Sequence, residues 1–294
     1  MGDSFLSYAV KPDWAGIWEK GIRDAWANDM ISRHGSINNA WDSYAREYEN
    51  GEIKYSNRVE LLEKIAKCKP KSVLDVGAGT GVFAIPLAKF VKKVVVVEPS
   101  AGMLKILQRK ARKEKLRNIE ILCKKWEDTS KEELLRHCSG GFDLVLVSHS
   151  LYYIRDLHHS FKKMNEISRG FVYLFTGCSG HSRDEAYQNM YLKLHKKPLP
   201  PYPDYSCLYM VLREIGIQPD IEMVVARAKK PIKSVDEVVN NWRKHLKMKK
   251  LSKDQKDAIN EYLADKIKKE NGKLYHSYEY KNALIYWKVE KNGN

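Results

Sequence analysis

The chain has 294 residues, 43% of them hydrophobic, and a formal net charge of +15 at pH 7, which indicate a folded globular protein with a basic surface. No stretch approaches the roughly 18 consecutive apolar residues of a membrane span, and the first residues lack the apolar core of a signal peptide. Five scattered cysteines without a Cys-x-x-Cys pair favour free thiols in a reducing cytoplasm over a disulfide frame, a zinc site or an iron–sulfur cluster.

Residues 1–55 are expected to form a helical cap. Asp13 can cap a helix in which Trp18 and Ile22 recur at helical spacing. A second helix, rich in aromatic residues, is expected around residues 40–48. We expect the first helix to pack against the main core, and such a helix can also roof a pocket.

Residues 56–178 alternate between short apolar runs and helical patterns, which is typical of a doubly wound parallel sheet. Helices are expected between the strands. The strands are expected at residues 72–76, 93–98, 118–123, 142–148 and 170–177.

The first of these strands runs into the sequence Val-Leu-Asp-Val-Gly-Ala-Gly-Thr-Gly, residues 73–81. Glycines in a strand-to-helix turn let bare backbone come close to a ligand. The second strand ends at Glu98, at the edge where open α/β sheets bind their ligands. A carboxylate there can accept two hydrogen bonds from a ribose diol, so the sequence predicts an adenosine-type ligand.

The glycine spacing distinguishes two classes of such ligands. The dinucleotide fingerprint requires Gly-x-Gly-x-x-Gly, but here Gly77 and Gly79 are followed by Val82 where the third glycine would stand. This disfavours a nicotinamide oxidoreductase. Residues 73–81, together with the acid of the second strand, closely resemble the first motif of the class I, Rossmann-like S-adenosylmethionine-dependent methyltransferases. The resemblance covers about residues 40–178.

The resemblance implies an α/β fold with a doubly wound, seven-stranded and mostly parallel sheet whose last strand runs antiparallel. We expect the sixth strand at residues 220–228 and the last at residues 278–289. It also implies an enzyme that transfers the methyl group of S-adenosyl-L-methionine.

The resemblance further implies which residues bind the cofactor. An aromatic ring near Tyr48 would lie over its methionine end, Asp75 would order the glycine turn, and Met103 would lie on the adenine face unless it is a core residue. The full expected set is Tyr48, Asp75, Gly77, Ala78, Gly79, Gly81, Glu98, Pro99, Met103, Trp126, Glu127 and Ser148.

The segment after the third strand departs from the family pattern. Lys125 occupies the position where the family has an acid that binds the adenine amino group. We therefore expect Trp126 to pack against adenine, and Glu127 or Asp128 to accept from the amino group.

The methyl acceptor is expected to bind where the fourth strand ends, beside Ser148. The Asn/Asp-Pro-Pro-Tyr tetrapeptide of the family's DNA and amide enzymes is absent there, as is a motif cysteine, and both absences favour a small-molecule acceptor. His149 is a candidate general base because imidazole titrates near neutrality, although it can equally cap or pack the loop. Tyr152 is the second candidate catalytic residue. The expected acceptor-binding set is Tyr44, His149, Tyr153, His181, Arg183 and Tyr187.

Two stretches, residues 179–205 and 234–271, exceed what the bare fold needs, and we expect both to form a lid. The expected division is a helical cap at 1–55, the cofactor-binding core at 56–178, a lid segment with a helix and strand six at 179–233, inserted lid helices at 234–271, and the last core strand at 272–294.

The basic charge leaves two alternatives to a small-molecule methyltransferase. Residues 229–270 hold 13 Lys and Arg against 7 Asp and Glu, but interleaved at helical spacing, which is typical of a solvated helix face. An RNA or protein methyltransferase that docks through these helices is the second hypothesis, and a non-catalytic S-adenosylmethionine-binding module is the third. No carboxylate or cysteine stands at metal-ligand spacing from His158 and His159, so we expect no metal site. The acceptor and the oligomeric state stay open.

Overall fold

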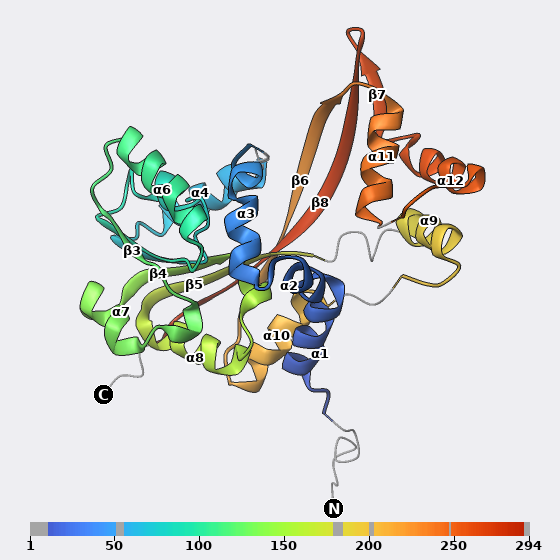
Figure 1. Ribbon diagram of the computed structural model, residues 1–294. Helices are drawn as coiled ribbons and strands as arrows, with labels where there is room; N and C mark the ends of the chain where they lie inside the picture. Colours follow the sequence, from blue (N-terminus) through green and yellow to red (C-terminus); the bar gives the residue numbers. More distant parts are fainter. Residues whose placement is uncertain (1–10, 51–55, 179–184, 200–202, 247, 291–294) are drawn as a thin grey trace, which may run out of the picture.

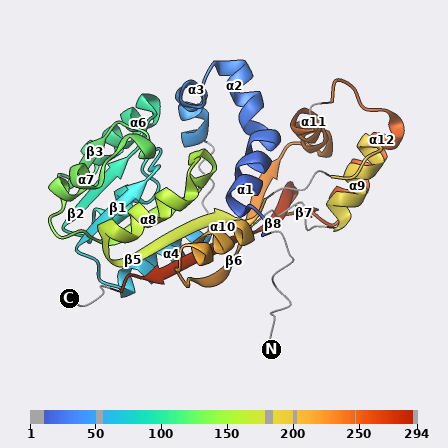
Figure 2. The same cartoon turned by 90° about the horizontal axis from the view of Figure 1, so that it is seen from below.

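The computed structural model describes residues 11–50, 56–178, 185–199, 203–246 and 248–290 (Figures 1 and 2). Its strands form one sheet in the order β3-β2-β1-β4-β5-β8-β6, and a short strand β7 pairs with β8 outside this path. The strands are β1 (Ser72–Val76), β2 (Lys93–Val97), β3 (Ile119–Leu122), β4 (Phe142–Ser148), β5 (Ser168–Gly177), β6 (Asp220–Ile232), β7 (Ile267–Glu270) and β8 (Lys273–Lys288).

The expected fold class is confirmed by the strand directions. Strands β1 to β5 pair in parallel, and β8 is antiparallel to both of its neighbours, β5 and β6. Four of the five residues of β2 and all of β1 are buried. Because helices cover both faces of a parallel sheet, its central strands carry continuous apolar runs instead of alternating ones.

The helices lie on both sides of the sheet. They are α1 (Trp14–Ile22), α2 (Asn28–His34), α3 (Ile37–Asn50), α4 (Ser56–Lys67), α5 (Ala84–Leu87), α6 (Ala101–Lys113), α7 (Lys131–His137), α8 (Leu157–Ile167), α9 (Glu185–His195), α10 (Tyr205–Glu214), α11 (Val235–His245) and α12 (Lys253–Leu263). A π-helical turn (Arg23–Ala27) joins α1 to α2, and two 3-10 turns cover Trp126–Asp128 and Leu151–Tyr153.

Two apolar layers hold these helices to the sheet. One face packs against α1, α7, α8 and α10 through buried side chains such as Trp18, Phe161 and Leu208. The other face packs against α4, α5 and α6 through side chains such as Leu61 and Leu107. Most of the stabilising apolar burial therefore lies within the sheet and its two helix layers.

The N-terminal helices follow the sequence expectation and cross the edge of the sheet. Asp13 caps α1 by accepting a hydrogen bond from the Gly16 amide at 2.9 Å. Gly35 ends α2 in the left-handed conformation, with φ of 75°, and lets α3 set off in a new direction. Helix α3 then packs on α6, where Ala45 and Met103 are buried together.

The C-terminal strands are longer than the sequence predicts. β6 and β8 pair without interruption from Asp220 opposite Tyr286 to Ile232 opposite Leu274, so the ribbon extends past the expected strand bounds through residues 229–232 and 274–277. Cross-strand pairing compensates for the weak strand propensity of lysine. Figure 1 shows this ribbon extending beyond the sheet, beside α9, α11 and α12.

The projecting part has an apolar core of its own. Buried residues of α9, α11 and α12 form one cluster, which includes Tyr187, Val239 and Ile259 and contacts Ile232 and Ile267 on the ribbon. We call α9, α11, α12, β7 and the adjoining ends of β6 and β8 the distal lobe.

Candidate active site

A cavity of about 1020 Å³ lies at the carboxyl edge of the sheet. Its floor comes from the ends of β1, β2, β4 and β5, and its roof from residues between Met30 and Trp41 on α2 and α3. Small-molecule sites measure roughly 300–1,000 Å³, so this cavity has room for a nucleoside cofactor and a second molecule.

The three motif glycines have three different roles. A Cβ on Gly77, whose φ is 73°, would lie 2.2 Å from the Cβ of Ser150, so this glycine lets the β4 loop come close. A Cβ on Gly79, whose φ is 54°, would meet no atom within 4 Å. A Cβ on Gly81 would lie 2.9 Å from the Leu107 side chain, and Gly81 is not part of the cavity wall. Gly81, expected to bind the cofactor, therefore serves helix packing.

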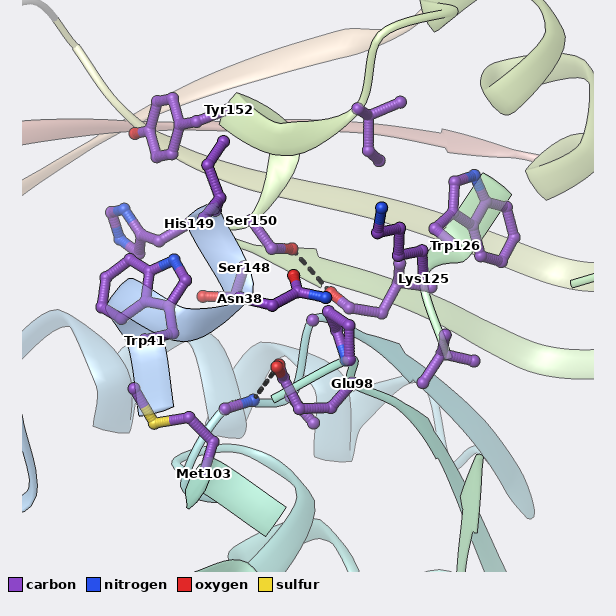
Figure 3. A pocket seen from close by; sticks show the side chains of 18 of the residues that line it. Asn38, Trp41, Glu98, Met103, Lys125, Trp126, Ser148, His149, Ser150 and Tyr152 are labelled. Atoms are coloured by element: carbon purple, nitrogen blue, oxygen red, sulfur yellow. Dashed lines mark hydrogen bonds between the residues drawn. The ribbon is translucent and has the colours of Figure 1, made fainter. Parts of the chain in front are cut away.

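Glu98 is bound to the glycine loop. Its Oε2 accepts a hydrogen bond from the Gly79 amide at 2.9 Å (Figure 3), and its Oε1 accepts one from the Ser100 amide at 2.9 Å. The side chain lines the cavity and is 7% exposed. Burial raises the pKa of this carboxyl, while the two amides oppose that shift. Each oxygen keeps a lone pair for a ligand hydroxyl.

Asp75 is a second buried acid beside the glycine loop. It is 2% exposed, and within the described residues its Oδ2 has no hydrogen-bond partner. Burial raises its pKa to about 7, the nearby charge of Glu98 adds to this shift, and a hydrogen bond from the Ala84 backbone opposes it. A buried carboxylate with one unsatisfied oxygen is costly, so the two acids favour a cationic ligand.

Trp126 is fixed by the core. Its ring is 4% exposed, and the Lys163 ammonium lies 4.0 Å from the ring centroid. The same ammonium donates to the carbonyls of Trp126 and Thr129, both at 2.8 Å, and burial lowers its pKa. Lys163 thus holds the loop after β3, from which Lys125, Trp126, Glu127 and Asp128 line the cavity.

His149 lies at the end of β4 in a strained conformation. Its φ is 52°, a left-handed region that non-glycine residues seldom adopt. Its amide donates to the Phe175 carbonyl at 2.8 Å, and the two rings meet edge to face at 5.3 Å. Burial lowers the pKa of the imidazole to about 4. His149 is therefore neutral at physiological pH and a weaker base than the sequence suggests.

Tyr152 lines the cavity, but its hydroxyl is engaged elsewhere. The oxygen accepts from the Gly177 amide at 3.2 Å and lies 3.1 Å from the Thr176 hydroxyl oxygen. The ring stacks on Trp18 with centroids 5.9 Å apart. These contacts fit a residue that supports the pocket better than the expected catalytic one.

The roof supplies residues that sequence reasoning missed. Figure 3 shows Asn38 and Trp41 reaching from α3 toward Ser148 and His149 across the cavity. Trp41 also packs against Met103, which lines the cavity from α6. The aromatic helix was visible in the sequence, but no local signal indicated that Asn38 faces the site.

The walls fit S-adenosyl-L-methionine. The unpartnered oxygen of Asp75 suits a ligand with positive charge, the open space at Gly79 admits a ligand against bare backbone, and Glu98 has lone pairs for a ribose diol. Residues 73–169 match the family model described as "Methyltransferase domain". The chain therefore contains a class I, S-adenosylmethionine-dependent methyltransferase domain.

Relatives of this methyltransferase include an uncharacterized protein of Haemophilus influenzae, 24% identical over 233 residues, which are 79% of this chain and 81% of that protein. A ribosomal protein L11 methyltransferase of Caldicellulosiruptor bescii is 26% identical over 185 residues, 58% of this chain and 56% of the relative. The crystal structure of a candidate methyltransferase from Bacillus halodurans has the same fold, with a TM-score of 0.51 and 17% identity over 80% of this chain and 100% of that one.

The structure brings most of the expected cofactor residues of the methyltransferase to one cavity. The expected residues that line it are Asp75, Gly77, Ala78, Gly79, Glu98, Pro99, Met103, Trp126, Glu127, Ser148, His149 and Tyr152. The side chains of Tyr48 and Tyr153 lie outside the described part of the structure, as do His181 and Arg183.

Two expected acceptor residues lie elsewhere. Tyr44 is not part of the cavity wall, and its ring meets that of His34 edge to face at 5.3 Å. Tyr187 is buried in the distal lobe between Trp242 and Tyr262, with centroids 5.5 and 6.0 Å away. Burial raises the pKa of its hydroxyl to about 12. Neither residue faces the site.

The structure does not place the expected lid segments over the cavity. Of the described residues from 185 to 290, none lines the cavity, because the β6–β8 ribbon holds α11 and α12 away from the sheet. Helices α2 and α3 form the roof instead. Across the described ranges, no group of three or more His, Cys, Asp or Glu residues is arranged to hold a metal ion, and no helix has the length and apolarity of a membrane span.

Proposed function

We propose that this methyltransferase acts on a small molecule, which binds between the glycine loop and the roof helix α3. The observation that carries this proposal is the cavity itself, about 1020 Å³ in volume and covered by α2 and α3. A cavity walled by the sheet edge and these two helices suits a ligand that is largely surrounded by protein, since excluding water keeps it from competing with the acceptor.

The cofactor would supply an activated methyl group. On its side of the cavity, Glu98 would accept from the ribose hydroxyls, Asp75 would stabilise the positive charge, and the loop around Gly79 would follow the ligand with its backbone.

The acceptor side offers neutral hydrogen-bonding groups. The carboxamide of Asn38, the hydroxyl of Ser148 and the neutral imidazole of His149 line the cavity, with the rings of Trp41 and Phe175 among them. Such groups orient a hydroxyl or amine between aromatic walls without requiring it to be charged. Orientation alone accounts for much of the acceleration in a displacement of this kind.

The test is a screen of small metabolites with isotope-labelled S-adenosylmethionine. We expect Asn38→Ala to reduce transfer about tenfold or more while leaving the affinity for S-adenosylhomocysteine within twofold of wild type. Tyr44→Phe, on the same helix but off the cavity wall, is the matched control and should change neither value. Transfer to RNA or protein with none to metabolites would contradict the proposal.

RNA is the second candidate acceptor, and the distal lobe favours it. Lys249 and Lys250, in the loop that joins α11 to α12, and Lys253 at the start of α12 are exposed, and among the described residues no ion pair involves them. Lysines that contact RNA phosphates make binding depend steeply on the salt concentration. If RNA is the acceptor, reversing these three charges to Glu should weaken binding and reduce its salt slope, whereas Lys105→Glu on α6 should do neither. A small-molecule enzyme would keep full turnover in both variants.

We also propose a cytoplasmic location for the enzyme. All five cysteines are free thiols, and Cys68 and Cys123 are exposed. Exposed free thiols suit a reducing compartment.

A further inference from the structure

Asp42 joins the roof helix α3 to the turn that follows β2. Its Oδ1 accepts a hydrogen bond from the Ser100 hydroxyl at 2.6 Å and another from the Gly102 amide at 2.7 Å. Gly102 is needed for this approach, because a Cβ there would lie 3.0 Å from the Asp42 Cα. A carboxylate of one helix thus helps to cap the N-terminus of another, α6, where negative charge is favoured.

The same turn holds the acid expected to bind ribose. The Ser100 amide donates to Glu98 Oε1 at 2.9 Å, and Glu98 Oε2 accepts from the Gly79 amide at 2.9 Å. A continuous set of hydrogen bonds therefore runs from the glycine loop through Glu98 and Ser100 to Asp42. The charge of Asp42 also contributes to raising the Glu98 pKa, after burial, which is the main cause.

The other end of this connection faces the acceptor space. Trp41 directly precedes Asp42 on α3, Asn38 lies one turn earlier, and both side chains line the cavity (Figure 3). We propose that Asp42 is a positioning residue that couples ribose binding at Glu98 to the placement of the roof helix over the acceptor. A bound cofactor would thereby fix the acceptor wall, which favours binding of the cofactor first.

A second tie between the same two helices offers a matched control. Glu49, near the end of α3, forms an ion pair with Arg109 of α6, and neither residue lines the cavity. It joins the helices as Asp42 does, but none of its hydrogen bonds leads to Glu98. If α3 needs only to be attached to α6, loss of either tie should have the same effect.

The coupling can be measured without knowing the acceptor, by hydrogen exchange of the full-length enzyme with and without S-adenosylhomocysteine. In wild type we expect saturating ligand to slow exchange of α3 amides at least fivefold. Asp42→Ala should remove this slowing and weaken ligand affinity about tenfold, the effect of losing hydrogen bonds to a charged group. Glu49→Ala should keep both near wild type.

Two further variants separate positioning from simple loss of structure. Asp42→Asn keeps the accepting oxygen and should restore most of the slowing, whereas Ser100→Ala removes the hydroxyl bond to Asp42, leaves only the Gly102 amide bound to that carboxylate, and should reduce the slowing. The proposal rests on ribose binding at Glu98. If wild type does not bind the ligand, that assignment fails, and if it binds but Asp42→Ala keeps the full slowing of α3, the coupling alone is overturned. Equal effects of Asp42→Ala and Glu49→Ala would also overturn it.

Discussion

The amide of Gly79 and the carboxylate of Glu98, 19 positions apart in the chain, are joined by a hydrogen bond of 2.9 Å. The glycine loop after β1 and the acid after β2 are therefore one hydrogen-bonded unit. Glu98 helps to hold the loop in its conformation, and a loop that is held in place costs less to order when a ligand binds. The same bond also means that replacing the acid changes the loop as well as the ribose contact.

Replacing Glu98 by Ala should weaken S-adenosylmethionine binding at least tenfold. The variant loses a charged acceptor for the ribose hydroxyls, each hydrogen bond worth roughly 1.5–3 kcal/mol, and releases the Gly79 amide. Isothermal titration calorimetry gives the affinity. Glu132→Ala, an exposed acid at the start of α7, serves as the control. Unchanged affinity in a folded Glu98→Ala variant would refute the ribose assignment.

Gly79→Ala should fold but bind the cofactor poorly. The new methyl group meets no protein atom within 4 Å, so the variant only incurs the cost of a left-handed alanine, about 1–2 kcal/mol. The space that the methyl enters is where the ligand would lie. Gly216→Ala is a matched control, since Gly216 has φ of 83°, equally open surroundings and no place in the cavity wall. Both should lose similar thermal stability, and equal cofactor affinity in the two would place the ligand elsewhere.

The parts of the site that the sequence predicted depend on short-range patterns. The strand that carries Asp75 and the acid at Glu98 follow from local apolar runs and glycine spacing, and parallel pairing brings the ends of the two strands to one edge. Burial is harder to read from sequence, so the residue type of His149 suggested a base near neutrality, while its surroundings lower its pKa to about 4.

The roof and the distal lobe depend on contacts between distant segments. Asp42 meets Ser100 across 58 positions, and no local pattern in α3 indicates that partner. Tyr187 was expected at the acceptor because it lies in the stretch, residues 179–205, that we expected to form a lid. Its position depends instead on the β6–β8 ribbon, whose strands pair past the bounds that we expected. The ribbon therefore carries the distal lobe away from the cavity.

The imidazole of His149 should stay neutral well below the usual titration range of histidine. Its pKa of about 4 follows from burial, so its ring nitrogens should show no titration between pH 5.5 and 8 in ¹⁵N NMR of histidine-labelled enzyme. His149→Asn assigns the signal and tolerates the left-handed backbone. Titration of that signal near pH 6.5 would show that water reaches the ring and would restore the general-base hypothesis.

The pKa of Asp75, about 7 in the folded protein against 3.8 for an ordinary aspartate, predicts opposite pH trends for stability and cofactor binding. Because the folded state holds this proton more tightly, the free energy of unfolding of the ligand-free enzyme should fall as pH rises from about 4 through 7, by up to about 4 kcal/mol. Affinity for the cationic cofactor should rise over pH 6–8 as Asp75 ionises. Asp75→Asn should flatten both curves, and at pH 8 should unfold at a higher temperature than wild type yet bind S-adenosylmethionine more weakly.

Asp143 is the control for this prediction. Burial alone would raise the pKa of Asp143, but its ion pair with Arg169 and its hydrogen bonds from backbone amides lower it. Asp143→Asn should therefore destabilise the protein at pH 8. Thermal melts and calorimetry from pH 4 to 8 supply both curves, and an Asp75→Asn variant that is less stable than wild type at pH 8 would show that the ionised carboxylate is stabilised in the folded protein and would contradict the raised pKa.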